Sequence, residues 1–362
     1  MIYVYHSLFP RYVFKPLLCF KPMLAARTPT QYAEKVKQFI LKKKVINSNY
    51  KVIREMDFLF FPLTKKITIP HAVVVNTKFS FPLRNKVPTI DELLKTKLTP
   101  HQFSLLPRSQ EIIGTILILE IPPELHPQEK MIAEAYLQSH PHVTTVVKKS
   151  DIHGGIFRTR KVKIIAGKRS KETVHMESGV KMKLHLEKTY FSARSSNERL
   201  RIARQVKPNE LILVMFSGIA PYPLVLAKHS PAQKIYGVEF NPLAHQYALE
   251  NVILNNLDPK IIIYRGDVRI VLPKIPVTFD RIIMPLPKTG DQFLGLALSK
   301  AKKSSIIHLY DFIDEESIPS QKRAIQALAA SFQHRVAVRN VVTCGQFSPK
   351  LWRVCFDVEV LK

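Results

Sequence analysis

The chain has 362 residues, which is long enough for two or three domains and a sizeable hydrophobic core. Hydrophobic residues make up 46% of it, so a globular protein is expected rather than a disordered one. It carries 55 lysines and arginines against 28 aspartates and glutamates, a formal net charge of +27. A generally basic proteome would explain part of this excess. The charge favours a polyanionic partner, with nucleic acid ahead of an anionic membrane.

Several protein classes are excluded at this stage. No apolar run approaches the roughly 18 residues that a membrane-spanning helix needs. The first 22 residues are aromatic and basic and lack a continuous apolar core, so no secretory signal is expected. Cys19, Cys344 and Cys355 are far apart and show no CxxC or Cys/His spacing. We therefore expect no metal site and a reducing cytoplasmic setting. We also expect a monomeric protein.

The first 80 residues predict a small α+β domain. Residues 28–45 have the spacing of an amphipathic helix, and residues 50–53 and 58–63 are typical of paired strands. Residues 81–108 are rich in Pro, Lys and Thr and are expected to form a linker, with one helical turn over 90–94 as an alternative.

Residues 109–188 predict a second α+β domain, which we interpret as an RNA-binding and catalytic-support domain. Residues 111–120 are expected as one strand interrupted by Gly114, and 127–139 as a helix. Further strands are expected over 143–149, 158–166, 173–177 and 180–186.

Residues 189–362 alternate strand-like and helix-like segments, a pattern that predicts a mostly parallel sheet with helices on both faces. The expected strands are 211–216, 235–239, 261–265, 280–284 and 304–309, and the expected helices are 221–228, 242–256 and 290–302. Two last strands, 335–342 and 351–359, are expected to close the sheet in antiparallel fashion.

Three of these strands end in residues suited to a nucleoside. Gly218 lets the backbone turn sharply after the first strand, and this lone glycine favours a nucleoside such as S-adenosylmethionine over a pyrophosphate. Glu239, at the tip of the second strand, can bind both ribose hydroxyls. Asp267 follows the third strand and can accept from an adenine amino group or cap the next helix. Because such ends share one sheet edge, the three together are a stronger sign than any alone.

A resemblance is carried by three strings that precede these strands. They are GGIFRTRK (154–161), TVHMESG (173–179) and YFSARSSNERLRI (190–202). With the strands above, they resemble the archaeal and eukaryotic tRNA (guanine-37, N1)-methyltransferases and the related wybutosine-pathway enzymes. The likeness covers about residues 108–310. The first 80 residues resemble the family's small tRNA-contacting domain more loosely.

The resemblance implies a Rossmann-like class I methyltransferase fold, S-adenosylmethionine as cofactor and tRNA as partner. It implies Glu198 as the base that removes the guanine N1 proton and Arg158 as the cation facing O6, roles that the chemistry of N1 methylation requires. Arg199 matches a family arginine near the pocket. The expected cofactor-binding residues are Arg199, Phe216, Gly218, Glu239, Phe240, Asp267, Val268 and Pro285.

The leading interpretation is methyl transfer to N1 of guanosine 37, and two alternatives stay open. Pro285 stands where the family has the Asn of an Asn-Leu-Pro motif, and it has no donor with which to bind a base. A wybutosine-pathway transferase, moving an aminocarboxypropyl group or methylating a tricyclic guanosine, would also lack that Asn. The first strand also ends without an acid, at Met215, so a non-catalytic RNA-binding relative is the second alternative.

Overall fold

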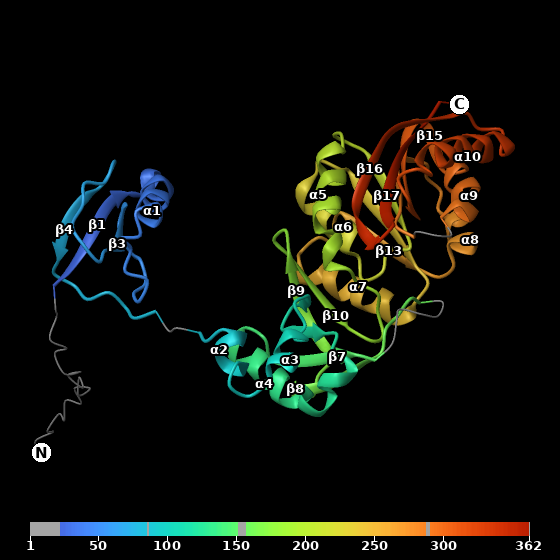
Figure 1. Cartoon of the computed structure of the whole chain (residues 1–362). Coiled ribbons are helices and arrows are strands. Elements are labelled where there is room, and N and C mark those ends of the chain that lie inside the picture. Colours follow the sequence, from blue (N-terminus) through green and yellow to red (C-terminus); the bar gives the residue numbers. More distant parts are fainter. Residues whose placement is uncertain (1–21, 85–86, 151–156, 287–289, 362) are drawn as a thin grey trace, which may run out of the picture. The chain divides into compact units, whose positions relative to one another are not determined.

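A computed structural model describes residues 22–84, 87–150, 157–286 and 290–361 (Figure 1). The chain divides into two compact units, residues 1–87 and 88–362. The divisions expected at residues 108 and 188 fall inside the second unit. None of the described helices is long and apolar enough to cross a membrane.

The first unit is a four-stranded antiparallel sheet in the order β2-β3-β1-β4. Its elements are β1 (Met23–Pro29), η1 (Thr30–Tyr32), α1 (Ala33–Lys42), β2 (Ile53–Glu55), β3 (Phe58–Pro62) and β4 (Val73–Thr77). Val36 and Ile40 of α1 pack on Ala26 and Phe61 of the sheet, which confirms the predicted amphipathic helix. The pairing of β2 with β3 is also confirmed. Strands β1 and β4 were not predicted.

The second unit begins with two short helices inside the segment expected as a linker. They are α2 (Ile90–Leu94) and α3 (Pro100–Ser104), and each starts with a capping box, at Thr89 and Thr99. Leu94, Leu98 and Leu106 are buried in the same core as α4 (Glu129–Ser139). This segment is therefore part of the folded unit, because its leucines find a partner surface that its Pro- and Lys-rich composition does not reveal.

The next part is a four-stranded sheet in the order β5-β6-β7-β8, beside a separate β9–β10 hairpin. Its strands are β5 (Gln110–Ile113), β6 (Ile116–Leu119), β7 (Thr145–Lys149), β8 (Val162–Gly167), β9 (Glu172–Glu177) and β10 (Val180–His185). The single strand expected over 111–120 is wrong, because β5 and β6 pair antiparallel about Gly114. Gly114 has φ +57°, and a Cβ there would lie 2.2 Å from Thr173 Oγ1.

The largest sheet has seven strands in the order β13-β12-β11-β14-β15-β17-β16. Its strands are β11 (Leu211–Met215), β12 (Lys234–Glu239), β13 (Ile261–Arg265), β14 (Phe279–Met284), β15 (Ala301–Ile313), β16 (Val336–Ser348) and β17 (Leu351–Val360). Strands β13 to β15 in this order run parallel, and β17 pairs antiparallel with both neighbours, as predicted. The order reverses between β11 and β14, which is where open α/β sheets bind ligands.

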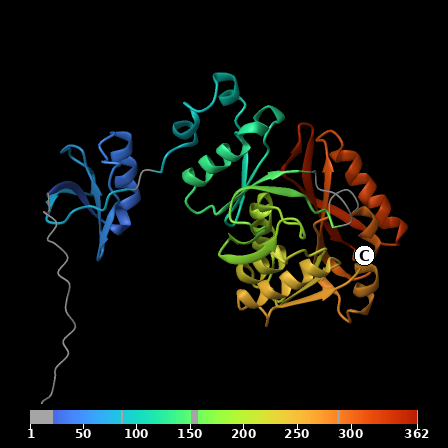
Figure 2. The same cartoon turned by 90° about the horizontal axis from the view of Figure 1, so that it is seen from below.

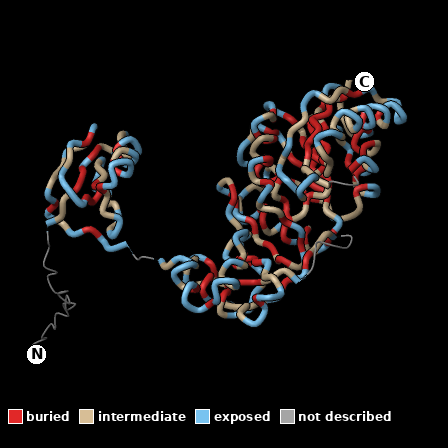
Figure 3. Tube along the Cα trace, in the orientation of Figure 1, coloured by how far each residue is buried: buried red, intermediate tan, exposed pale blue. Residues whose placement is uncertain are grey.

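Helices cover both faces of this sheet (Figures 1 and 2). They are α5 (Ser196–Gln205), α6 (Pro221–His229), α7 (Pro242–Leu254), α8 (Val268–Val271), α9 (Leu294–Leu298) and α10 (Ile318–Ser331). Alternate residues of β11 point to opposite faces. Ile212 and Val214 join one core with α5–α7, and Leu213 and Met215 join the other with α8–α10. The buried residues accordingly concentrate along the strands (Figure 3).

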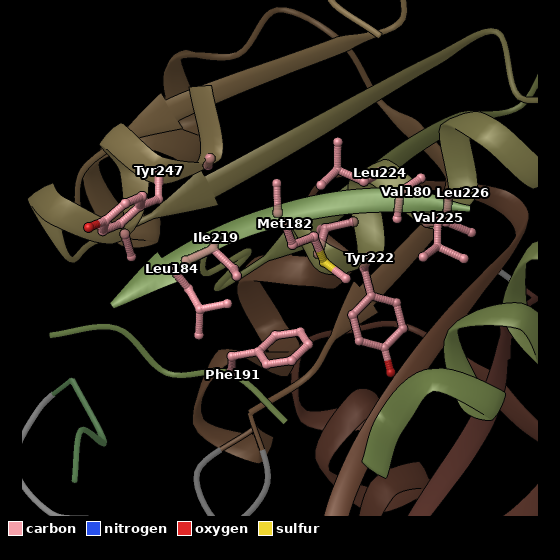
Figure 4. Packing of buried hydrophobic residues seen from close by; sticks show 14 of the residues in the cluster. Val180, Met182, Leu184, Phe191, Ile219, Tyr222, Leu224, Val225, Leu226 and Tyr247 are labelled. Carbon is pink, nitrogen blue, oxygen red and sulfur yellow. The ribbon is translucent and has the colours of Figure 1, made fainter. Parts of the chain in front are cut away.

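The β9–β10 hairpin is attached to the first of these cores. Val180, Met182 and Leu184 of β10 pack against Ile219 and the residues of α6 (Figure 4). The helix predicted over 290–302 is shorter, since α9 ends at Leu298 and β15 already begins at Ala301. Helix α10 was not predicted.

Candidate active site

A cavity of about 380 Å³ opens where the strands β11 to β14 end, and we call it the sheet-edge cavity. All the predicted cofactor-binding residues except Arg199 line it, together with Arg158. These residues are Phe216, Gly218, Glu239, Phe240, Asp267, Val268 and Pro285. Parallel strands present their carboxyl ends at one edge, so residues distant in the sequence meet here.

Glu239 is held in the wall of this cavity by backbone amides. Gly218 N donates to Glu239 Oε2 at 2.6 Å, and Asn241 N donates to Oε1 at 2.7 Å. Burial raises the pKa of the Glu239 carboxyl, and these amide bonds oppose the shift. A carboxylate has about four acceptor sites, so Glu239 can still accept from a ribose hydroxyl. Glu239 is thus not an acid surrounded by solvent at the end of its strand.

The backbone before Gly218 is unusual. Gly218 has φ +58° and Phe216 has φ +58°, a region that residues with a side chain rarely occupy. Such conformations gather at ligand sites, where the surrounding structure enforces them. The turn aims the Gly218 amide at Glu239 and places the Phe216 ring on the cavity wall.

Asp267 serves as the cap of the next helix, one of the two functions that the sequence left open, and its contact with an adenine amino group stays a prediction. Its Oδ1 accepts from Arg269 N at 2.9 Å and so caps α8, and its carboxylate also lines the sheet-edge cavity. The hydrogen bonds from Arg269 hold the pKa of the Asp267 carboxyl below its usual value.

A second, smaller cavity of about 70 Å³ adjoins the first, and we call it the inner cavity. The two share Tyr190, Phe216, Gly218 and Pro285. The inner cavity also exposes polar side chains, which are Ser192, Ser195, Arg199, Ser217, Tyr222, Tyr310 and Arg353. Ser217 is buried, and its Oγ makes no hydrogen bond with any of the described residues. An unbonded polar atom on a cavity wall is a natural contact for a ligand.

Glu198 is buried on α5 and is not one of the residues that line either cavity. It accepts two hydrogen bonds from Arg201, at 2.7 and 2.8 Å. The Tyr310 hydroxyl donates to Glu198 Oε1 at 2.6 Å, and Tyr222 donates to the Tyr310 oxygen at 3.0 Å. Tyr310 does line the inner cavity, so the carboxylate reaches that cavity through the tyrosine hydroxyl.

Arg201 is also part of this internal network. It also donates to Asp357, which accepts from His308 Nδ1 at 2.6 Å. Burial would raise the pKa of Asp357, but the bonds from His308 and Arg201 outweigh it and hold that pKa far below its usual range. His308, Cys355 and Asp357 have metal-ligand geometry, yet Arg201 points its positive charge at Asp357 and Cys355.

Arg199 is also buried, with 2% of its surface exposed. Its guanidinium forms a two-pronged ion pair with Glu177 and lies near the rings of Phe191 and Tyr222. Glu198 and Arg199 are neighbours in the sequence, but each is buried with a different partner. Arg199 lines the inner cavity rather than the sheet-edge cavity.

Arg158 is half-buried on the wall of the sheet-edge cavity, with φ +50°. Burial lowers the pKa of its guanidinium, and the neighbouring Tyr190 opposes that shift. The residues Gly154, Gly155 and Ile156 of the same string lie outside the described residues.

Three family models match the chain. They are the tRNA methyltransferase 5 N-terminal domain over residues 25–69, the TYW2 N-terminal domain over 90–170 and the TRM5/TYW2 methyltransferase domain over 173–338. The tRNA (guanine(37)-N(1))-methyltransferase Trm5b of Pyrococcus abyssi is 32% identical over 338 residues, 93% of this chain and 99% of its own length. The chain belongs to the TRM5/TYW2 methyltransferase family.

Relatives in this family differ in the reaction that they are named for. A tRNA(Phe) (4-demethylwyosine(37)-C(7)) aminocarboxypropyltransferase of Pyrococcus horikoshii is 33% identical over 278 residues, 76% of this chain and 97% of its own length. Among solved structures, Trm5b of P. abyssi has a TM-score of 0.69 at 31% identity over 94% of this chain and 100% of its own. The P. horikoshii TYW2 complex with MeSAdo has a TM-score of 0.66 at 31% identity, covering 75% and 98%.

The family resemblance, the class I methyltransferase fold and the enzyme class predicted from the sequence are therefore confirmed. The roles of individual residues stay predictions. The sequence missed Tyr310, Tyr222 and Asp357, which lie far from the family strings. One contact had a local signal: Glu198 and Arg201 are three positions apart on a helix, and this spacing could have indicated the ion pair between them.

Proposed function

We propose that this protein transfers a methyl group from S-adenosylmethionine to N1 of guanosine 37 of tRNA. The observation that carries the proposal is the pair of adjoining cavities. One offers a fixed carboxylate and a glycine turn suited to a nucleoside, and the other offers a buried hydroxyl bonded to a buried carboxylate. The match to P. abyssi Trm5b over nearly the whole chain, first unit included, supports the substrate.

The residues of the sheet-edge cavity suit the cofactor. Glu239 would bind the ribose hydroxyls, Asp267 would meet the adenine end, and Phe216, Phe240 and Val268 would enclose the rings. S-adenosylmethionine, when bound, supplies an electrophilic methyl carbon. The protein's part is then to align the target base and remove its proton, and alignment alone supplies several kcal/mol.

The proton path follows the hydrogen bonds of the inner cavity. As N1 of guanine gains the methyl group, its proton passes to the Tyr310 oxygen, and the Tyr310 proton passes to Glu198 Oε1. Tyr310 starts and ends neutral, because burial raises its pKa well above the ordinary value. Arg201 holds the Glu198 carboxylate in place. Glu198 thus keeps the predicted role of base and acts through a relay.

Arg158 would stabilise the negative charge that grows on O6 as the N1 proton leaves, and its position on the wall of the sheet-edge cavity, next to the inner cavity, supports this role. Pro285 stands at the junction of the two cavities and can only shape the wall. The Ser217 hydroxyl is a polar group on the same wall that can bind the substrate instead.

Product analysis tests the proposal. The protein is incubated with an unmodified tRNA transcript and labelled S-adenosylmethionine, and the nucleosides are separated. We expect 1-methylguanosine from position 37. Glu198→Ala and Arg158→Ala should abolish turnover while tRNA still binds. Full turnover in either variant would refute the assigned roles, and no labelled nucleoside with the wild type would refute the proposed reaction.

A second candidate reaction is aminocarboxypropyl transfer to a wyosine-type guanosine. Pro285 in place of the family Asn favours it, as does the TYW2 N-terminal domain model over residues 90–170. Both reactions need the same cofactor, and the carbon that faces the base decides which group moves. The mass gain separates them, because methyl transfer adds about 14 mass units and aminocarboxypropyl transfer about 101.

The proposal also includes the cellular location and the oligomeric state of the protein. A cytoplasmic monomer fits the two described cysteines, Cys344 and Cys355, which are both free thiols. Sedimentation of the purified protein at micromolar concentration tests the monomer, and a dimeric mass would contradict it.

A further inference from the structure

A third cavity, of about 320 Å³, adjoins the inner cavity, and we call it the outer cavity. It shares Tyr190, Phe191, Ser192, Phe312 and Arg353 with the inner cavity. The tip of the β16–β17 hairpin forms one of its walls through residues 344–347. If the target base of an RNA occupies the inner cavity, the next nucleotide of that RNA would lie in the outer cavity.

The walls of the outer cavity are positively charged. Lys149, Arg160, Arg194 and Arg353 line it against one acid, Glu111. Arg160 pairs with Glu111 at 2.8 Å and Lys149 pairs with Glu120, so within the described part of the chain Arg194 and Arg353 are the lining cations without an acidic partner. The Arg353 guanidinium donates to the Ser195 hydroxyl and the Cys344 carbonyl, which carry no charge. Its Nε is buried and bonds to none of the described residues.

The same walls carry aromatic rings. Phe347 stacks on Phe312 with centroids 4.0 Å apart and planes 28° from parallel. Phe347 is 53% exposed, so one face of its ring remains accessible from the cavity. Proteins bind single-stranded nucleic acid without reading its sequence in grooves that combine cationic side chains for the backbone with aromatic rings on which the bases stack.

We propose that the outer cavity binds the nucleotide next to the target guanosine. Arg353 takes the phosphate between the two nucleotides, and the neighbouring base stacks on the Phe347–Phe312 pair. This inference rests on the proposed tRNA substrate and adds a second contact to it. It explains how a base is kept out of its stack, because the neighbour exchanges base stacking for stacking on phenylalanine.

The first test is Phe347→Ala. Loss of base stacking on one aromatic ring weakens RNA binding by roughly tenfold. The dissociation constant of tRNA should rise by that factor while the affinity for S-adenosylmethionine stays unchanged. Phe332→Ala is the matched control, since Phe332 is 47% exposed and lines none of the three cavities. Arg353→Gln should likewise weaken tRNA binding, with Arg339→Gln as its control and the melting temperature as a check of folding.

The second test uses the RNA. Transcripts are made with an abasic site on one side or the other of the target guanosine, and each is measured with wild type and Phe347→Ala. The variant should lose affinity for the intact transcript but not for one of the abasic transcripts, because the stacking partner is already missing. Equal losses on all transcripts, or no loss at all, would overturn the inference. A wild type that binds and methylates tRNA in the same assay separates that failure from failure of the proposed function.

Discussion

At the scale of single residues, the hydroxyl of Tyr310, which lines the inner cavity, donates to the carboxylate of Glu198, the predicted base. Glu198 was chosen from a family string, and the structure shows it enclosed by Arg201 and Tyr310. Because these side chains enclose the Glu198 carboxylate, the Tyr310 hydroxyl is the polar group that connects this carboxylate to the inner cavity. The residue scale therefore yields two predictions, one about this relay and one about the unbonded serine.

Tyr310→Phe keeps the ring and removes the relay oxygen. The turnover number should fall by about 10²–10⁴, the usual contribution of general acid–base catalysis, with little change in cofactor affinity. Tyr222→Phe leaves the bond from Tyr310 to Glu198 intact and should cost far less. Single-turnover methyl transfer measures both, and equal activity of Tyr310→Phe and wild type would contradict the relay.

Ser217→Ala separates binding from stability. The Ser217 Oγ bonds to none of the described residues, so its removal leaves no partner unsatisfied and should leave the melting temperature unchanged or slightly raised. If the hydroxyl binds the substrate, KM for tRNA or cofactor rises in the same variant. A lower melting temperature with normal kinetics would mean that the hydroxyl has only a structural role.

At the scale of elements, buried ion pairs fasten α5 to its neighbours. Arg199 joins α5 to the end of β9, and Arg201 joins it to β17. Glu177→Gln would leave the buried Arg199 charge without its counter-ion and should lower the free energy of unfolding by about 3–5 kcal/mol. Glu250→Gln removes a half-exposed pair with Lys183 and should cost under about 1 kcal/mol. Urea unfolding compares the two, and similar losses would contradict the buried pair.

The contact of β17 with α5 and β15 should also make stability depend on pH. Asp357 faces Arg201, His308 and Cys355, and its pKa is depressed in the folded protein. A depressed carboxyl pKa stabilises the fold above the unfolded value of about 3.9, and this stabilisation is lost as pH falls further. The stability difference between wild type and Asp357→Asn should therefore shrink below about pH 4. A difference that stays constant across that range would contradict the assigned shift.

At the scale of the whole molecule, the net charge and the two units lead to predictions about binding of the proposed tRNA substrate. The net charge of +27 predicts that the logarithm of the association constant falls linearly with the logarithm of salt concentration. The first unit has its own core around Val36, Ile40 and Phe61, so its removal should leave the second unit folded. A chain of residues 88–362 should bind the cofactor as before and bind tRNA more weakly, with a shallower salt slope. An unchanged slope would mean that the first unit makes no phosphate contacts.

The sequence by itself determined that the large sheet is mostly parallel and closed by two antiparallel strands, and which residues stand at its strand ends. Alternating apolar strands and helices admit few arrangements, and parallel strands must present their carboxyl ends together, so Gly218, Glu239 and Asp267 could be placed before any coordinates. The family strings likewise indicated Glu198 and Arg158.

Tertiary structure decided what those residues touch. Tyr310 lies 112 positions from Glu198 along the chain and bonds to it at 2.6 Å. Asp357 lies 159 positions from Glu198, and Arg201 bonds to both carboxylates. Local patterns cannot report such contacts, because they arise when β15 and β17 pair beside α5. The linker predicted over residues 81–108 is wrong for the same reason. The leucines of this segment are buried by partners that only the folded unit supplies.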